Sequence, residues 1–308
     1  LHNRTHSFPT RRSSDLNAIA PLVSQPMRPA TSLERPTFAL PEGACDAHMH
    51  VFGPLETYPS VRHPQYTLPD GTLSQYKQVM ETLGLRKFII VQPSFYDTDN
   101  RCLIDALKAA GDAARGIVMI DPDTPEKTLR DYHDAGVRGV RLDLFKRRDL
   151  PLPEIREFIL NSAAMAAPLG WHLQFYAPGY VVRDLLDFLA TLDIDFVIDH
   201  MGYMLEEDGL TEADFDRLLS LLKEGRCWLK ASAPYRLAKK RGMEAVDEIA
   251  KAIVRAAPEK TIWGSDWPHI PEGGRDTGAL LNQLALWAPA PTDRRLILAD
   301  NPKKLFGF

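Results

Sequence analysis

Short apolar runs alternate with amphipathic stretches along the chain from residue 45 onward. The β-rich runs lie at residues 45–51, 86–91, 116–120, 137–142, 171–176, 195–199, 227–230 and 261–264. Apolar residues at helical spacing lie between and after them, at residues 73–83, 103–110, 125–135, 152–167, 182–191, 212–222, 243–257, 276–287 and 291–299. The pattern therefore predicts eight strands that alternate with helices.

Strands separated by helices of this length must run parallel, because a parallel crossover needs about a dozen residues or more. Eight such units over roughly 260 residues fit a (β/α)8 TIM barrel, an α/β fold, better than an open sheet. No GxGxxG motif follows the first strand and no fixed repeat is visible, which argues against a dinucleotide-binding fold and a solenoid. We expect a single barrel domain over residues 41–308.

The first 40 residues follow a different pattern. Residues 1–16 have no periodicity, and residues 17–40 are rich in proline, serine and alanine, so neither segment can bury an apolar face. We expect residues 1–40 to form a disordered extension. Residues 1–16 also resemble a translated adapter sequence and are excluded from the fold argument. The Arg11-Arg12 pair is followed by a proline-broken segment, which disfavours an export signal.

Composition narrows the class of protein. The chain has 308 residues, 44% of them apolar and 25% charged, which is typical of a soluble globular protein. The formal net charge of −4 gives no indication of nucleic acid or an anionic membrane surface as a partner. No apolar run approaches the ~20 residues of a membrane helix. Cys45, Cys102 and Cys227 form no CxxC motif and indicate buried thiols in the cytoplasm. No pattern indicates the oligomeric state.

His48 and His50 lie two residues apart at the end of the first predicted strand. Residues i and i+2 of a strand point to one face, so the two imidazoles should converge, and Asp46 shares that parity one step deeper. Such a pair can bind a metal, or it can hold a carbonyl group with two neutral donors. The alternative is that both are ordinary polar residues at a strand end. The loop signal Gly53-Pro54 just beyond favours the functional interpretation.

In a TIM barrel the active site lies at the carboxyl ends of the strands. The candidates near those ends are polar or charged: Ser94, Arg141, Arg147, Tyr176, His200, Tyr203, Arg236 and Asp266. The sequence therefore predicts a site that combines imidazoles, a carboxylate and several guanidinium groups.

Three of these motifs resemble the amidohydrolase superfamily: His48-x-His50, Asp199-His200-Met201-Gly202 and Gly264-Ser265-Asp266-Trp267-Pro268. More narrowly, residues 41–308 resemble the 2-pyrone-4,6-dicarboxylate lactonases and their relatives. The supporting motifs are Tyr66-Thr67, Gln92-Pro93-Ser94, Gly139-Val140-Arg141, Lys146-Arg147 and residues 300–306. The resemblance implies a hydrolase acting on a carboxylic ester.

The resemblance also bears on metal binding. Many members hold one or two divalent metals with the first-strand histidines, a lysine or glutamate on strand four, a histidine on strand five, and the later histidine and aspartate. Here strand four offers Arg141, which is always protonated and cannot ligate a metal. Strand five offers Gln174 and Tyr176, and His172 lies too early, near the bottom of the barrel. The binuclear site is therefore incomplete.

A mononuclear site remains open, because three or four nitrogen and oxygen ligands suffice for one Zn²⁺. Its ligands would be His48, His50, His200 and Asp266. The lactonases that this chain resembles work without metal, so we expect no cofactor.

In the metal-free mechanism that the resemblance implies, Asp266 is the general base for water, a role typically worth about 10²–10⁴-fold. His48, His50 and His200 would polarise the lactone carbonyl and stabilise the oxyanion. The structural alternative for Asp266 is a helix N-cap.

Substrate recognition should depend on cations. Arg141, Arg147 and Arg236 can each bind a carboxylate in bidentate fashion, and Ser94, Tyr176 and Tyr58 would add hydrogen bonds, whereas Arg138 and Arg148 look solvated. Tyr203 stands where the lactonases have an arginine after His-Met-Gly. The substrate could therefore be a related mono- or dicarboxylate lactone or a sugar-acid lactone.

Three functions follow. The first is hydrolysis of a carboxylate-bearing lactone, 2-pyrone-4,6-dicarboxylate or a close relative, in aromatic-acid catabolism. The second is a zinc-dependent enzyme of the same superfamily that acts on a sugar-acid lactone or as a decarboxylase. The third is a catalytically inactive barrel that serves as a binding protein.

Overall fold

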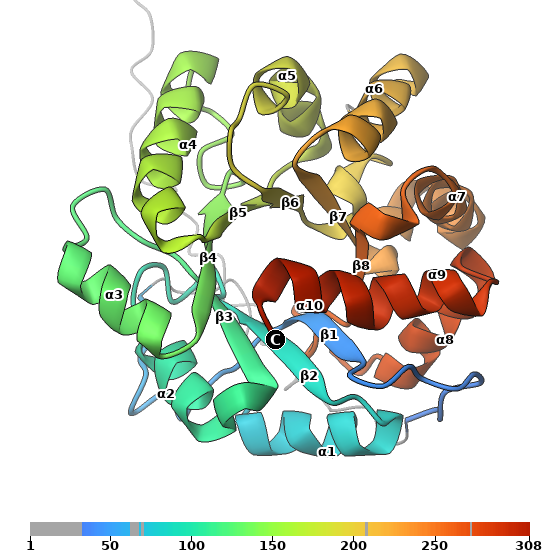
Figure 1. Cartoon of the computed structure of the whole chain (residues 1–308), viewed down its shortest axis with the longest axis horizontal. Coiled ribbons are helices and arrows are strands. Elements are labelled where there is room, and N and C mark those ends of the chain that lie inside the picture. The colour runs from blue at the N-terminus through green and yellow to red at the C-terminus, as the bar shows by residue number, and fades with distance from the viewer. Residues whose placement is uncertain (1–32, 62–67, 69–70, 207–208, 272) are drawn as a thin grey trace, which may run out of the picture.

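The computed structural model describes residues 33–61, 68, 71–206, 209–271 and 273–308, and it forms a barrel (Figure 1). Eight strands make one sheet in chain order: β1 Cys45–Met49, β2 Lys87–Val91, β3 Ala114–Val118, β4 Val137–Asp143, β5 His172–Tyr176, β6 Phe196–Ile198, β7 Cys227–Ser232 and β8 Thr261–Gly264. Each consecutive pair of strands is parallel. The predicted (β/α)8 TIM barrel is confirmed. Residues 1–32 and the Tyr66-Thr67 motif lie outside the described residues.

The helices surround the strands, most of them outside the ring and the last two across one end of it (Figure 1). They are α1 Leu73–Leu83, α2 Arg101–Ala110, α3 Glu126–Asp134, α4 Leu152–Ala166, α5 Gly179–Leu189, α6 Glu212–Glu224, α7 Pro234–Ala256, α8 Thr277–Trp287, α9 Pro291–Arg295 and α10 Asn301–Phe306. Single turns of tighter or wider helix occur at Gly111–Ala113, Ala167–Leu169, Pro258–Lys260 and Leu296–Asp300. The residues of His200–Tyr203 form a turn with left-handed φ values of 49–65°. Several helices begin at a polar residue whose side chain caps the helix. For example, Thr72 accepts a hydrogen bond from the amide of Gln75 at the start of α1.

The residues along each strand alternate between two apolar layers. Outward residues pack with the helices in one large core, and inward residues fill the barrel as a smaller cluster. The inward cluster consists of Cys45, Ala47, Ile89, Val91, Ile117, Val197, Trp228 and Ile262, together with Phe306 from α10. Helices α9 and α10 cross one end of the barrel in Figure 1. The Phe306 ring contacts the ring of His172, the first residue of β5, so α10 covers the amino-terminal end.

Helix α7 consists of two helical segments that meet at Gly242. The second segment follows the predicted helix at 243–257, whereas the first, which begins at Pro234, was not predicted. The helix is kinked at Gly242, which has a φ of 77°, and its N-cap, Ala233, is left-handed with a φ of 48°. Because of this early start, Tyr235 and Arg236 lie in the first helical turn directly after β7. The predicted closing helix at 291–299 is likewise divided into α9, a π-turn and α10.

The end of the predicted extension also differs from expectation. The amide of Glu34 donates to the Asp276 carboxylate at 2.9 Å, and the amide of Thr37 donates to Asn282 Oδ1 at 2.8 Å. Residues 33–40 therefore lie against α8 and are not a free segment, because these bonds anchor their backbone.

Two expectations about the class of protein bear on the fold. None of the helices in the described part of the chain has the length and apolar content needed to span a membrane. Cys45, Cys102 and Cys227 are free thiols and buried.

The Phe306 side chain gives the first testable prediction. It is fully buried at the covered end of the barrel, so Phe306→Ala should lower the free energy of unfolding by about 3–5 kcal/mol through lost burial and a residual cavity. Urea unfolding followed by circular dichroism measures this change. Leu286→Ala on α8, where the side chain is 50% exposed, is the control and should change the free energy by less than about 0.5 kcal/mol. Equal effects would show that α10 does not close the barrel.

Candidate active site

The first strand carries a β-bulge that turns His48 inward. The register between β1 and β2 shifts between Asp46 and Met49. A bulge adds one residue to the alternation, so Asp46 and His48 do not share a face. The Asp46 carboxylate instead accepts hydrogen bonds from the Tyr76 hydroxyl of α1 at 2.8 Å and the Ser265 amide at 2.9 Å. The prediction that Asp46 shares the parity of the histidines is wrong, and Asp46 joins β1 to the residues after β8.

The backbone closes the barrel between β1 and the residues that follow β8. The amide of Asp266 donates to the His48 carbonyl at 2.8 Å, and the amide of His50 donates to the Trp267 carbonyl at 2.8 Å. A Cβ on Gly264 would lie 2.5 Å from the His48 Cβ, so this close approach requires glycine. These contacts place the two histidines beside Asp266.

Three imidazoles converge on one oxygen of Asp266. The Nε2 atoms of His48, His50 and His200 lie 3.7, 3.5 and 3.7 Å from Asp266 Oδ1. All four side chains are buried. The structure therefore brings together the four residues predicted to be catalytic.

The other oxygen of Asp266 is held by residues of α7. Its Oδ2 accepts hydrogen bonds from the Tyr235 hydroxyl at 2.5 Å and from Arg236 Nε at 2.9 Å. Burial alone would raise the pKa of Asp266, but the Arg236 guanidinium and His200 outweigh it and hold this pKa well below its usual value. Asp266 is therefore ionised, with Oδ1 directed at the histidines.

Each histidine is oriented by its other ring nitrogen, as catalytic and metal-binding histidines commonly are. His50 Nδ1 lies 2.8 Å from the Val91 carbonyl and therefore donates its proton there. His200 Nδ1 lies 2.8 Å from Ser232 Oγ. Burial lowers the pKa of His200 to about 4, so its imidazole is neutral at neutral pH.

Below these residues lies a buried polar layer that the sequence analysis missed. Lys230 of β7 is fully buried, and its Nζ lies 3.3 Å from Asp199 Oδ1 and 3.2 Å from His48 Nδ1. Burial lowers the pKa of Lys230 to about 8, although the neighbouring Asp199 opposes this shift. Lys230 shares inward parity with Trp228, so the period of two would have identified it as a barrel-interior residue.

A pocket of about 240 Å³ opens above Asp266. It is lined by His50, Pro93, Ser94, Phe95, Arg141, Tyr176, His200, Arg236, Asp266, Ile270 and Pro271. Arg141 Nη1 donates to the Gln92 carbonyl at 2.8 Å, and its guanidinium lies 4.4 Å from the centre of the Tyr176 ring. The buried Arg141 Nε has no hydrogen-bond partner among the described residues, so a donor is left for a ligand.

Three predicted binding residues lie elsewhere. The guanidinium of Arg147 stacks 3.7 Å from the centre of the Phe158 ring on α4. The Tyr58 hydroxyl donates to Asp105 on α2 at 2.7 Å. Tyr203 packs on Phe145 and lines a neighbouring hollow of about 580 Å³ that shares Tyr176 and Arg236 with the pocket. Arg236, which we predicted to bind substrate, is paired with Asp266 instead of being free.

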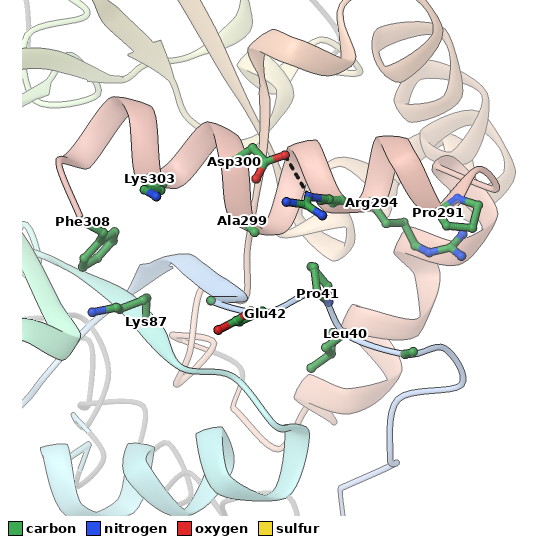
Figure 2. A pocket seen from close by; sticks show the side chains of 13 residues that line it. Leu40, Pro41, Glu42, Lys87, Pro291, Arg294, Ala299, Asp300, Lys303 and Phe308 are labelled. Atoms are coloured by element: carbon green, nitrogen blue, oxygen red, sulfur yellow. Dashed lines mark hydrogen bonds and ion pairs between the residues drawn. The ribbon is translucent and has the colours of Figure 1, made fainter.

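No histidine is among the described residues that line the hollow at the other end of the barrel (Figure 2). It has a volume of about 680 Å³, and its lining includes Lys87, the first residue of β2, and Lys303 of α10. Its carboxylates are Glu42 and Asp300, and Asp300 accepts a hydrogen bond from Arg295 at 3.2 Å. His172 also lies at this end, beside Phe306, as predicted. The candidate active site is therefore the smaller pocket at the carboxyl ends of the strands.

The residues could hold one divalent cation. Donor atoms of His48, His200 and Asp266 lie within 4.8 Å of one another. His48 Nε2 and Asp266 Oδ1 are buried without a hydrogen-bond partner among the described residues, as metal donors would be. A cation bound there would supply Lewis-acid polarisation of a carbonyl.

The chain matches a known protein family over most of its length. The amidohydrolase family model matches residues 45–308, which include every strand and the whole site. The chain belongs to the amidohydrolase family.

Three relatives of this amidohydrolase are informative. It is 32% identical over 284 residues to a 2-pyrone-4,6-dicarboxylate hydrolase of Comamonas testosteroni, covering 88% of this chain and 92% of the relative. It is 32% identical over 277 residues to a 4-sulfomuconolactone hydrolase of Rhizobium radiobacter, with the same coverage of both chains. A solved structure of a probable 2-pyrone-4,6-dicarboxylic acid hydrolase from Acinetobacter baumannii, with citric acid bound, matches with a TM-score of 0.73 and 28% identity, covering 86% of this chain and 100% of that one.

The buried histidines predict a pH dependence of stability. Burial lowers the pKa of His172 to about 3 and the pKa of His269 to about 4, whereas both groups titrate near 6.5 when unfolded. Between these values the unfolded chain binds more protons than the folded chain. The free energy of unfolding should therefore fall as the pH falls from 6.5 towards 4, by about 1.4 kcal/mol per unit for each such histidine.

Urea unfolding between pH 7 and pH 4.5, with chelator present, measures this slope. His172→Gln should reduce it, because one titrating group is removed. A free energy of unfolding that stays constant over this range would contradict the burial of the histidines.

Proposed function

We propose that this amidohydrolase hydrolyses a lactone that carries a carboxylate, with 2-pyrone-4,6-dicarboxylate or a close relative as substrate, in the catabolism of aromatic acids. The observation that carries the proposal is the convergence of three imidazole Nε2 atoms on Asp266 Oδ1 at the base of a pocket that also holds Arg141. The names of two relatives, each a hydrolase of an anionic lactone, support the same reaction.

Arg141 is the group that would bind the carboxylate. This residue is 5% exposed, stacks on Tyr176 and keeps Nε without a partner among the described residues. Ser94 Oγ lies 3.4 Å from its Nη1 and lines the same pocket. A buried guanidinium that lacks an anion is unfavourable, and a bidentate carboxylate would satisfy it.

The reaction uses Asp266 as the base. Asp266 Oδ1 takes a proton from water while the water oxygen bonds to the lactone carbonyl carbon. The imidazoles of His48 and His200 stabilise the negative charge that develops on the carbonyl oxygen. The bond between the carbonyl carbon and the ring oxygen then breaks, and the proton held by Asp266 passes to the departing ring oxygen. The product is the open-chain acid.

We further propose that this reaction needs no metal and takes place in the cytoplasm. The strand-four position holds the cation Arg141, and β5 offers Gln174, whose amide donates to Asp199 at 3.0 Å. Arg236 and Tyr235 occupy Asp266 Oδ2, so only one oxygen of this carboxylate faces the histidines. The positive charges of Arg141 and Arg236 lie close to the site and would disfavour a metal cation there.

One observation favours a lactone with a single carboxylate. Tyr203 is 6% exposed and packs edge-on to Phe145, with ring centres 5.0 Å apart, in the hollow beside Arg236. The part of the substrate that extends in this direction would meet the rings of Tyr176 and Tyr203 first, whereas Arg148 and Lys239 also line the hollow. A monocarboxylate lactone, including a sugar-acid lactone, is therefore the second candidate.

Hydrolysis of 2-pyrone-4,6-dicarboxylate, followed by ultraviolet absorbance, tests the proposal directly. We expect turnover that exhaustive chelation leaves unchanged. Asp266→Asn removes the base and should lower kcat by at least about 10²–10⁴-fold. Asp97→Asn, at a partly exposed carboxylate paired with Lys146, is the matched control and should retain activity. Activity that appears only with added zinc would overturn the metal-free mechanism, and no activity on any lactone would favour a binding protein.

The two arginines of β4 and its loop provide a separate test. Arg141→Met should raise KM for the dicarboxylate by about 10–100-fold, because a charge-assisted contact worth about 1.5–3 kcal/mol is lost. Arg147→Met should change KM much less, since Arg147 lies on Phe158 outside the pocket lining. Steady-state kinetics of both variants measure the difference. A larger effect at Arg147 would place the anion site at Arg147 and contradict the role proposed for Arg141.

A further inference from the structure

Lys230 occupies the centre of the polar layer beneath the active site. Its side chain is fully buried on β7, and its Nζ has three close neighbours. Gln174 Oε1 lies at 2.7 Å, His48 Nδ1 at 3.2 Å and Asp199 Oδ1 at 3.3 Å. Lys230 does not line the pocket, so it acts on a ligand only through these neighbours.

The hydrogen bonds of this layer can be assigned one by one. An ammonium group has three N–H donors and no acceptor. The orientation of Gln174 is fixed because its Nε2 donates to Asp199 Oδ2 at 3.0 Å, which leaves Oε1 to accept from Lys230. A second ammonium proton pairs with Asp199 Oδ1. The third points to His48 Nδ1, which must then carry a lone pair.

We infer that Lys230 is a positioning residue that holds His48 in the tautomer protonated on Nε2. In the other tautomer, His48 Nδ1 would donate to Asp199 Oδ1 at 3.4 Å. Its ring N–H would then face the ammonium at 3.2 Å, a contact between two donors. The Nε2–H tautomer avoids this contact and gives each ammonium proton a neighbour that can accept it, so it is the arrangement that the geometry favours.

This tautomer gives His48 and His50 opposite roles, an inference that rests on the proposed function. His48 presents a proton on Nε2 to the pocket base, where a carbonyl oxygen gains charge during hydrolysis. His50 donates its Nδ1 proton to the Val91 carbonyl and therefore presents a lone pair on Nε2. His48 in this form has no lone pair for a metal, so Lys230 also opposes a cation at the site.

The tautomer can be observed without any substrate. In chelated protein labelled with ¹⁵N-histidine, long-range ¹H–¹⁵N spectra distinguish a protonated ring nitrogen from one with a lone pair. His48→Asn assigns the signal by its loss. We expect His48 protonated on Nε2 in the wild type. A wild-type His48 protonated on Nδ1 would overturn the inference, whatever the substrate proves to be.

Lys230→Met removes the donor and keeps an unbranched side chain. We expect His48 to change to the Nδ1–H tautomer, bonded to Asp199. For lactone hydrolysis we expect kcat to fall about 100-fold while KM changes by less than about twofold, because a transition-state donor is lost and the anion site is untouched. Zinc affinity should rise about tenfold or more, measured by titration. An unchanged tautomer would overturn the inference.

A double variant separates positioning from folding. Lys230→Met combined with Asp199→Asn removes both buried charges, so no carboxylate is left unpaired. The amide introduced by Asp199→Asn can still accept from Gln174 through its oxygen, and its nitrogen can donate to His48 Nδ1. We expect this variant to regain the Nε2–H tautomer. Its kcat should be at least about tenfold higher than that of Lys230→Met alone. A return of the tautomer without any gain in kcat would retain the positioning role and contradict the catalytic role given to the tautomer, whereas loss of both would overturn the positioning role. Absence of wild-type turnover would contradict the proposed lactonase alone.

Discussion

The closure of the barrel between β1 and the residues after β8 is the constraint on which the site depends. Two backbone hydrogen bonds join these segments, from Asp266 to His48 and from His50 to Trp267. They fix the spacing between the histidine pair and the carboxylate independently of side-chain packing. The contact requires Gly264 next to His48 and a φ of 61° at Asp266. Such a φ is uncommon for residues other than glycine, although aspartate tolerates it better than most.

Charge in this barrel is buried in pairs at two levels. Lys230 and Asp199 form the lower pair, and Arg236 and Asp266 form the upper one. Removing one member of a buried pair typically costs about 3–5 kcal/mol, because the other charge is left unpaired. The members of each pair therefore depend on each other, because neither charge can be buried alone without a large loss of stability. Arg141 forms no ion pair within the described residues, so the positive charge that remains at the pocket favours an anionic ligand.

Sequence reasoning predicted the barrel and the converging histidines, because strand ends in a parallel barrel must meet at one face. The bulge in β1 moved Asp46 to the outside, and alternation alone gives no sign of such an insertion. Lys230 was missed because its strand was treated as an apolar run and not assigned by parity. The placement of Arg236 depends on a helix that starts directly after β7. Arg147 follows β4 but stacks on α4, a contact that strand order cannot predict.

The electrostatics of Asp266 determine how much of the catalysis in the proposed hydrolysis must come from groups other than the base. Arg236 and Tyr235 hold Oδ2, and the low pKa of this carboxylate keeps it ionised but makes it a weak base. A weak base removes a proton efficiently only when the attacked carbonyl is strongly polarised, since the proton of the water becomes more acidic as the new bond forms. The main stabilisation must then come from donors at the carbonyl oxygen. Preorganised donors act best where water is excluded, and the layer around Lys230 orients one of them from below.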